Sequence, residues 1–468
     1  MYRPSTAAIG SIGATIPARV RAGMHSLPLP RSYAALKPRD IWAVVIAVGL
    51  IIEMMWVRHG GLSRDLLTAS GEVTALVGTY AALVGILFAA RAPWLDQVLG
   101  TDGLRSAHRI LGFVAVWAIG AHAVLSTIAY AGGSIAGAIP TLISLVLTVP
   151  GMLGAVVGLA LFGVVAVSSV RAARRRLSYE SWHGIHLYVY LAVAFAFLHQ
   201  LTIGADFLGD SVATWFWIGL YVVAFGPLLL HRVAWPMWLT LRHRPRIKRI
   251  VAEAGGSYSL YVGGRAMERL AVRPGQFFVV RALTRRDWMH GHPFSISAAP
   301  DGRTLRFTFK TFGQGTRDLA ALRPGTPLLL EGPYGAMHEA KRQTVGVLLI
   351  CGGIGVSPIR AMAQSFAIVP GAADMIYRAQ SEPEAPLLDE LRAIAARRDM
   401  RLHLVFGRRG SAAVGDDPLG PDEIARLIPD AARRDVYVCG PTSLMDRVRD
   451  SMHALGTPPK QIHFELFG

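Results

Sequence analysis

The segment SYESWHGIHLYVYLAVAFAFLHQLTIG, which runs from Ser178 to Gly204, is apolar and long enough to form a membrane-spanning helix. It carries three histidines, His183, His186 and His199. Imidazole side chains are costly to place in hydrocarbon, so each of them needs a partner or a function there. The segment therefore predicts a helix that is built around a buried polar site.

A second apolar segment, Arg105 to Tyr130, carries His108 and His122 fourteen residues apart, whereas His186 and His199 are thirteen apart. At about 1.5 Å of rise per residue, these separations span roughly 21 Å and roughly 19.5 Å. Two adjacent helices would then each offer one histidine at two matching depths. This arrangement predicts two stacked haems, with the four imidazoles as the iron ligands.

The rotation of these side chains around their helices agrees less well. Fourteen residues at ~100° each return to within about 40° of the starting face, whereas thirteen miss it by about 140°. The second helix is therefore expected to bend, tighten or contain a bulge. His183 would span roughly 24 Å to His199, which fits worse than His186, so it is expected at a haem propionate or at the membrane surface. For any single histidine, a hydrogen bond between helices is the alternative.

Apolar residues are concentrated in the first half of the chain. The 468 residues are 52% hydrophobic, with a mean hydropathy of +0.38, and such a length has room for two or three domains. After Trp238 short β-type runs alternate with polar turns, as in a water-soluble module. Six apolar runs are long enough, or nearly so, to cross a bilayer: Ile41 to Val57, Val73 to Ala92, Leu104 to Ala129, Met152 to Val170, Ile185 to Thr202 and Val212 to Leu230.

The net charge of +17 brings nucleic-acid binding into consideration. The basic residues, however, collect at the flanks of apolar runs, at 171–176 and 242–249, rather than along an aromatic-studded groove. They favour a membrane-topology signal, and no nucleic-acid partner is expected. The two cysteines, Cys351 and Cys439, exclude a disulfide scaffold, a thiolate zinc site and a four-thiolate iron–sulfur cluster.

The distribution of basic residues also predicts the orientation of the helices. Residues 1–40 form a tail without a signal-peptide pattern, and its basic residues place the start of the first helix inside. Six crossings with both ends inside satisfy the positive-inside rule for every loop. The chain is therefore predicted to be a multi-pass protein of a bacterial-type plasma membrane, with the lipid bilayer as a partner. His108 and His186 would lie near the cytoplasmic face, and His122 and His199 near the outer face.

Glu53 lies in the predicted outer half of the first helix, close to Arg58 and His59. Acids within apolar runs are costly unless they are paired or face a polar cavity. These three residues either line a polar pocket above the outer haem or lie at the headgroup boundary.

The remaining residues predict two further domains. The expected boundaries are a tail at 1–40, a helical haem domain at 41–235, a β-rich domain at 243–340 and an α/β domain at 343–468. In the β-rich part, Gly and Pro turns separate short strands expected at Ile247–Ala252, Tyr258–Gly263, Gln276–Ala282, Leu305–Thr311 and Pro327–Leu330. Three motifs in this part are PGQFFVVR (Pro274 to Arg281), HPFSIS (His292 to Ser297) and GPYG (Gly332 to Gly335). They resemble the flavin-binding barrel of the ferredoxin-NADP reductase family.

This resemblance implies that the barrel binds FAD, and it places residues of the HPFSIS motif at the flavin: His292, Pro293, Phe294, Ser295 and Ser297. Most soluble relatives begin the motif with Arg, and the His found here is similar to the membrane NADPH oxidases and ferric reductases. The segment KTFGQGT precedes a helix expected to start near Arg317, and its Gly-rich turn has free N–H groups that suit a pyrophosphate. Lys310, Gly315 and Thr316 are the candidates in that turn. The alternative is an ordinary turn with a Thr cap.

The last part of the chain has the order of a nucleotide-binding fold. A buried strand predicted at Val345–Ile350 is followed directly by GGIGVSPIRAM, the context in which backbone can approach a dinucleotide phosphate. Later strands are expected to end in IYRAQS, VFGRRG and VYVCGP, and the series resembles the pyridine-nucleotide domain of the same reductase family. That resemblance implies a pyrophosphate site at Gly352, Gly353, Gly355, Ser357 and Pro358, with Cys439, Gly440 and Pro441 approaching the nicotinamide.

Two further residues define the expected nucleotide chemistry. Arg378 stands where an NAD-specific site would place an acid for the ribose hydroxyl, which favours a 2′-phosphate and hence NADPH. In the family a terminal aromatic covers the flavin face that the nicotinamide must reach, and Phe467 is the candidate here. An ordinary hydrophobic strand end is the alternative for Phe467.

Taken together, residues 70–468 resemble the NADPH oxidase and ferric reductase superfamily. The resemblance implies an oxidoreductase that passes electrons from cytosolic NADPH through FAD and two b-type haems to a small-molecule acceptor outside, either oxygen or ferric iron. Animal NADPH oxidases carry a further His four residues beyond the outer ligand, where this chain has Ser126, which weakens the expectation of superoxide production. The alternatives are a flavin reductase-type membrane protein that feeds a protein or quinone partner, and a haem-binding anchor without turnover.

Overall fold

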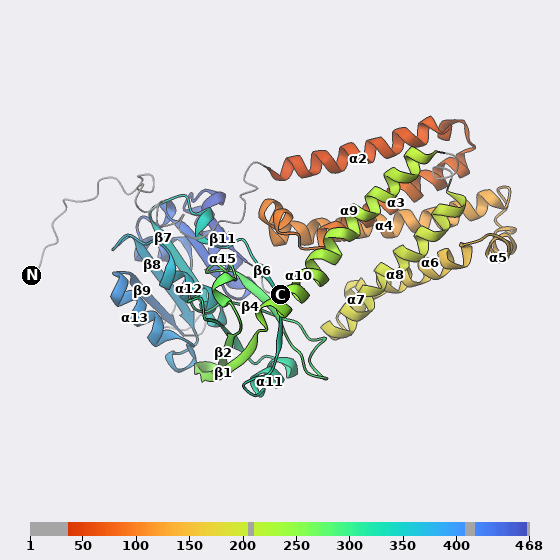
Figure 1. Ribbon diagram of the computed structural model, residues 1–468. Coiled ribbons are helices and arrows are strands. Elements are labelled where there is room, and N and C mark those ends of the chain that lie inside the picture. Colours follow the sequence, from red (N-terminus) through yellow and green to blue (C-terminus); the bar gives the residue numbers. More distant parts are fainter. Residues whose placement is uncertain (1–35, 205–209, 408–416, 466–468) are drawn as a thin grey trace, which may run out of the picture. The chain divides into compact units, whose positions relative to one another are not determined.

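The computed structural model describes residues 36–465, apart from 205–209 and 408–416 (Figure 1). Two compact units are present: a helical unit, Tyr33–Val233, and a C-terminal unit that contains Ala234–Gly468. Each is described by itself below. The predicted architecture of apolar helices followed by a β-domain and an α/β domain is confirmed.

The helical unit contains the six predicted membrane-spanning helices. Each includes a stretch that is long and apolar enough to cross a bilayer. They are α2 (Pro38–Arg58), α3 (Leu66–Ala89), α4 (Pro93–Tyr130), α6 (Met152–Ser169), α8 (Tyr179–Ile203) and α9 (Ser211–Leu229), with short helices α5 (Ala138–Thr148) and α7 (Arg171–Arg174) between them. After α9 the chain makes a π turn, Leu230–Ala234.

The outer surface of this unit is apolar. Large side chains such as Leu50, Trp117 and Val124 are 65%, 66% and 59% exposed. Exposing so many large apolar groups to water would be unfavourable, whereas lipid solvates them. The chain is therefore a multi-pass membrane protein, as predicted.

Helices α3 and α4 pack closely because α3 has a glycine at every seventh residue on the face toward α4. A Cβ atom added to Gly71 would lie 2.7 Å from Ser126 Oγ, and one added to Gly78 would lie 2.8 Å from Ile119. The next glycine, Gly85, lies against the ring of His108, 3.7 Å from its Nδ1. Small residues of this kind let the backbones of membrane helices approach one another.

The first part of the C-terminal unit is a six-stranded antiparallel barrel that follows α10 (Trp235–His243). Its two sheets have the orders β1-β2-β5 and β4-β3-β6, and bridges at Ile296–Phe307 and Arg246–Pro327 join them on both sides. Phe278, Phe307 and Leu260 fill the interior. The strands are β1 (Arg246–Glu253), β2 (Ser257–Gly263), β3 (Phe277–Ala282), β4 (His292–Ser295), β5 (Thr304–Lys310) and β6 (Leu328–Tyr334).

The helix after the KTFGQGT segment, α11 (Gln314–Ala320), starts three residues before the predicted Arg317. The prediction was wrong because Gly313 acts as the N-cap, so that Gln314, Gly315 and Thr316 form the first turn. The hydroxyl of Thr316 donates to the carbonyl of Gly313 at 3.0 Å and accepts from its N–H at 3.3 Å.

The second part of this unit is a five-stranded parallel sheet of order β11-β10-β7-β8-β9. Separate apolar cores cover its two faces, one containing Leu349 and Tyr377 and the other Ile350 and Val438. The strand order reverses between β7 and β10, and ligands of open parallel sheets bind outside the carboxyl ends of strands at such a point. The elements are β7 (Val347–Gly352), α12 (Val356–Ser365), β8 (Ala373–Ala379), α13 (Leu388–Arg398), β9 (Arg401–Phe406), α14 (Pro421–Leu427), β10 (Asp435–Cys439), α15 (Thr442–Ala454) and β11 (Ile462–Phe464).

Candidate functional site

His108 on α4 and His186 on α8 face one another. Their ring centroids are 6.0 Å apart, and the ring planes make an angle of 69°. Two imidazole nitrogens bound at ~2 Å on opposite sides of one metal ion would lie ~4 Å apart, with the ring centroids somewhat further. This pair of rings therefore has the spacing that a shared axial position requires.

Glycine carbonyls of α3 hold both histidines of α4. His108 Nδ1 lies 2.9 Å from the carbonyl oxygen of Gly85, and His122 Nδ1 lies 2.9 Å from that of Gly71. Because a carbonyl only accepts, Nδ1 carries the proton in both rings, and Nε2 is the nitrogen whose lone pair could bind a metal. Metal-ligating histidines almost always have such a second partner.

His199 lies thirteen residues after His186 on the same helix, α8, and its Nδ1 atom is buried. The Nδ1 atom of His186 is buried and has no hydrogen-bond partner among the described residues. Buried polar atoms without a hydrogen-bond partner are uncommon in proteins. The free Nδ1 atom therefore indicates that the His186 ring has a function other than hydrogen bonding within the protein.

Helix α8 is a continuous α-helix from Tyr179 to Ile203, so of the three expected irregularities (a bend, a tightened turn or a bulge) the bulge does not occur. The ring of His186 nevertheless reaches His108, because an imidazole extends well beyond the helix backbone. His183 instead lies beside Trp182, at 6.5 Å between ring centroids, and Trp182 stacks on His186 at 5.1 Å.

The donor set of the helical unit fits a metalloporphyrin. No group of three or more His, Cys, Asp or Glu side chains that could hold a bare metal ion occurs within the described part of the chain. A haem iron needs only two protein ligands, because the porphyrin supplies the other four nitrogens. Paired histidines without a third ligand agree with that requirement.

In the barrel, four aromatic rings form a stacked series around the HPFSIS motif. His292 stacks on Phe294 at 5.7 Å, Phe294 on Phe309 at 4.8 Å, and Phe309 on Tyr258 at 6.2 Å. A Cβ atom added to Gly315 would lie 2.9 Å from the His292 ring, so the first turn of α11 packs directly on that imidazole. The structure thus brings together the predicted residues His292, Phe294 and Gly315.

The hydroxyl of Ser297 points into the protein rather than toward a ligand. Ser297 is fully buried, and its Oγ accepts from Arg306 Nε at 3.0 Å and from Thr308 Oγ1 at 2.7 Å. Ser295 is also buried, with 6% of its surface exposed. Ser297 therefore positions Arg306 on the neighbouring strand, a role that the motif did not indicate.

Arg306 also forms an ion pair with the α/β part of the C-terminal unit. Its Nη1 lies 2.7 Å from Glu390 Oε1 on α13, and Arg360 Nη2 on α12 lies 2.6 Å from the other oxygen of Glu390. The hydroxyl of Ser357, a predicted pyrophosphate residue, donates to the carbonyl of Thr308 at 2.8 Å. These bonds tie β5 of the barrel to α12 and α13.

Replacing Glu390 by Gln is expected to lower the free energy of unfolding of the C-terminal unit by about 1–2 kcal/mol, because two nearly buried guanidinium groups lose their counterion. Burial raises the pKa of Glu390, but hydrogen bonds and charges from Arg306 and Arg360 lower it overall. The stabilisation is therefore present above pH ~4.5 and lost as the pH falls through the lower folded-state pKa, so the two proteins should converge in acid. Thermal unfolding between pH 3 and pH 7 measures this difference.

Glu382→Gln, which removes an exposed pair with Arg392, is the matched control. An equal effect from that control would contradict the prediction.

The glycine turn of the nucleotide domain packs directly on the VYVCGP loop. A Cβ atom added to Gly355 would lie 2.2 Å from the carbonyl oxygen of Cys439, and one added to Gly440 would lie 3.2 Å from the amide nitrogen of Gly352. A Cβ atom added to Gly352 would lie 2.5 Å from Leu444 Cδ1 and 3.4 Å from Pro441 Cδ. The predicted residues Gly352, Gly353, Gly355, Ser357, Pro358, Cys439, Gly440 and Pro441 thus gather at the carboxyl ends of β7 and β10.

Cys439 is buried, and burial raises the pKa of its thiol. Its thiol is therefore neutral and is not a nucleophile in this position. Arg378 lies near the carboxyl end of β8, as predicted, and donates to the carbonyl of Val405 at 3.1 Å and to those of Ala379 and Gly407. Phe467 lies outside the described residues.

Comparison with known proteins agrees with this geometry. Residues 74–197 match the family described as "Ferric reductase like transmembrane component", and residues 349–450 match "Oxidoreductase NAD-binding domain". The glycine betaine monooxygenase reductase subunit of Chromohalobacter salexigens is 24% identical over 254 residues, which cover 49% of this chain and 66% of the relative. A flavohemoprotein of Vibrio cholerae is 28% identical over 210 residues, which cover 42% of this chain and 52% of the relative.

One solved structure, the flavohem-like FAD/NAD binding domain of nitric oxide dioxygenase from Vibrio cholerae, has 21% identity and a TM-score of 0.41, and covers 48% of this chain and 99% of that one. The chain itself spans only 66% and 52% of the lengths of the two sequence relatives. The chain thus joins, in one polypeptide, a segment that matches a ferric reductase like transmembrane component and a segment that matches an oxidoreductase NAD-binding domain.

Proposed function

We propose that this protein carries electrons across the membrane, from cytosolic NADPH through FAD and two b-type haems to a small-molecule acceptor outside. The proposal rests on two matching spacings of fourteen residues, one between Gly71 and Gly85 on α3 and the other between His108 and His122 on α4. Gly71 and Gly85 on α3 hold His122 and His108 on α4 through their carbonyls, so the two imidazoles are oriented alike at two depths. A structural hydrogen bond between helices explains one such contact but not the repetition.

In this proposal His108 and His186 hold the inner haem, and His122 and His199 hold the outer haem. FAD accepts a hydride and releases single electrons, which is the chemistry that a one-electron haem chain needs. The residues of the chain supply orientation and a dry surrounding. Gly71 and Gly85 fix the imidazole tautomers, and the apolar helices exclude water from the path.

For the soluble half we propose that His292, Phe294 and the first turn of α11 receive the flavin, and that the glycine turn after β7 receives the pyrophosphate of the nucleotide. The proposal is supported by the packing of Gly315 on the His292 ring and by the close approach of the Gly355 backbone to that of Cys439 and Gly440. Arg378, near the carboxyl end of β8, supports NADPH over NADH through a charge near the ribose. Both ends of the chain and the reductase domains would then be cytoplasmic.

The acceptor is proposed to be oxygen or ferric iron, and one contact weighs on the choice between these two. Ser126 Oγ lies 3.1 Å from Nδ1 of His122, at the place where the animal oxidases carry a further histidine. A hydroxyl in that place hydrogen-bonds but cannot supply a charged imidazolium, so superoxide formation has less support than transfer to another acceptor.

The proposal is tested by adding NADPH without oxygen to the full, haem-loaded protein and following the haem spectrum. Reduction of both haems is expected, followed by reoxidation when oxygen or a ferric chelate is admitted separately. Oxidation of NADPH without haem reduction would instead support a flavin reductase that feeds another partner. A haem spectrum with no NADPH oxidation would support an anchor without turnover.

A further inference from the structure

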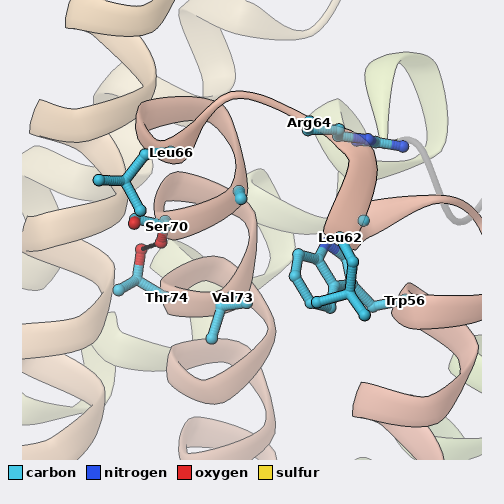
Figure 2. A pocket seen from close by; sticks show the side chains of 9 residues that line it. Trp56, Leu62, Arg64, Leu66, Ser70, Val73 and Thr74 are labelled. Atoms are coloured by element: carbon cyan, nitrogen blue, oxygen red, sulfur yellow. Dashed lines mark hydrogen bonds between the residues drawn. The ribbon is translucent and has the colours of Figure 1, made fainter.

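A pocket of about 570 Å³ opens between the end of α2, the turn that follows it and the start of α3. Figure 2 shows Trp56 and Leu62 on one side of it, with Ser70, Val73 and Thr74 on α3 opposite, and Arg64 at the top of the view. Its volume lies within the range of small-molecule sites, which are mostly apolar with a few polar groups. It is therefore large enough to hold the ring of an organic ligand.

The wall of the pocket touches the support of His122. Thr74 Oγ1, in that wall, shares its one proton between the carbonyl oxygens of Ser70, at 2.8 Å, and Gly71, at 2.9 Å. The Gly71 oxygen also accepts from Nδ1 of His122 at 2.9 Å. A ligand in the pocket would thus be separated from the His122 ring by two hydrogen bonds that share one carbonyl.

The charge of Arg64 in the wall is balanced by a neighbouring carboxylate, and this determines which charge a bound ligand can carry. Arg64 forms an ion pair with Glu72, and Trp56 Nε1 donates to the same carboxylate at 2.8 Å. An anionic, strongly hydrated ferric chelate would find no net positive charge here and would lose its hydration. A neutral, planar and largely apolar acceptor fits better.

One donor remains for such a ligand. The hydroxyl of Ser70 lines the pocket, and no hydrogen-bond partner for it occurs among the residues that the structure describes. A hydroxyl can donate one hydrogen bond, which suits a carbonyl acceptor. The indole of Trp56 is held in place because Gly61 packs on its face, and a Cβ atom there would lie 2.2 Å from the ring.

We infer that this pocket binds a quinone ring, which takes the place of oxygen or ferric iron as the terminal electron acceptor; the inference rests on the electron path of the proposed function and names a different acceptor class. His122 would hold the haem that supplies two electrons one at a time, and the quinone would take up two protons. The overall reaction is NADPH + H⁺ + quinone → NADP⁺ + quinol, so NADPH is oxidised and the quinone reduced. Trp56 and Val73 contact the ring, and Ser70 donates to one carbonyl.

The test uses the full protein with FAD and haem in lipid nanodiscs, and decylubiquinone as the probe. Val73→Trp fills the pocket and is expected to weaken decylubiquinone binding, measured by equilibrium dialysis, by about tenfold or more. Reoxidation of the reduced haem by decylubiquinone should slow by a similar factor, while NADPH still reduces the haem. Ser70→Ala removes only the donor, and a loss of about three- to tenfold in affinity is expected.

Val124→Trp adds the same ring to the exposed surface of α4 and is the matched control, with no change expected. Binding of decylubiquinone to Val73→Trp as tightly as to the unaltered protein would overturn the proposal, as would displacement of the quinone by ferric citrate. Failure of NADPH to reduce the haem would refute the proposed function instead, because binding by dialysis needs no electron transfer. If Val73→Trp does not fold, an unchanged affinity in Ser70→Ala overturns the pocket.

Discussion

The His186→Leu variant is expected to bind one haem in place of two and to lose electron transfer across the membrane. Leu removes the imidazole that lies 6.0 Å from His108 between ring centroids, while keeping the apolar bulk of the helix. Haem affinity at this level should fall by more than ~100-fold, because even the outer partners of metal-ligating histidines are worth 10- to 100-fold. The other pair, His122 and His199, lies thirteen to fourteen residues along the helices and should keep its haem.

The measurement is the Soret absorbance for each bound FAD, together with the rate of flavin reduction by NADPH. The absorbance should fall to about half while flavin reduction stays unchanged, because the C-terminal unit has its own cores. His183→Leu is the matched control, since it removes an imidazole three residues away on the same helix. A variant at His186 with two haems and an unchanged spectrum would show that the assignment of this ligand is wrong.

The helices and histidine pairs could be predicted because they depend on local patterns. Apolar runs of about twenty residues report a membrane span in any context. A separation of fourteen residues fixes a depth difference along a helix, whatever the neighbouring helices do. Thirteen residues were calculated to point His186 and His199 in directions about 140° apart, which suggested a distorted helix. The structure instead has α8 continuous, and the imidazole of His186 still lies against that of His108.

The support of the histidines was missed because a backbone carbonyl leaves no mark on composition. Gly71 and Gly85 look like ordinary membrane glycines, and only their fourteen-residue separation repeats that of His108 and His122. That repetition was the available signal. The pocket beside Trp56 had no such signal, because it forms only when the end of α2 and the start of α3 come together.

Two site residues of the C-terminal unit show how a motif can identify a place but not a role. The HPFSIS motif begins on β4, a strand that was not predicted from the sequence, and the Ser297 hydroxyl turns inward to Arg306 and Thr308. Ser357 likewise follows the glycine turn, yet its hydroxyl bonds the carbonyl of Thr308. In both cases the partner comes from β5, whose position across the barrel depends on the tertiary fold.

The Gly355→Ala variant is expected to bind NADPH about 10- to 100-fold more weakly, with FAD content unchanged. Gly355 has an ordinary right-handed backbone conformation, so alanine costs nothing there by itself. The loss comes from space, because the new Cβ would lie 2.2 Å from the carbonyl oxygen of Cys439 and 2.7 Å from the amide nitrogen of Gly440. Those atoms belong to a backbone that is paired with β7 and cannot yield as a flexible side chain would.

Gly353→Ala separates this clash from backbone strain. Its Cβ would meet nothing within 4 Å, but its φ of +54° is left-handed, so alanine costs about 1–2 kcal/mol in conformation. Flavin reduction at increasing NADPH concentration gives the affinity of each variant, and bound FAD reports the barrel. If the pyrophosphate lies against this turn, Gly355→Ala, which pushes β10 away from α12, must weaken NADPH binding more than Gly353→Ala, which only strains the backbone. Equal affinities in Gly355→Ala and the unaltered protein would place the nucleotide elsewhere on the sheet.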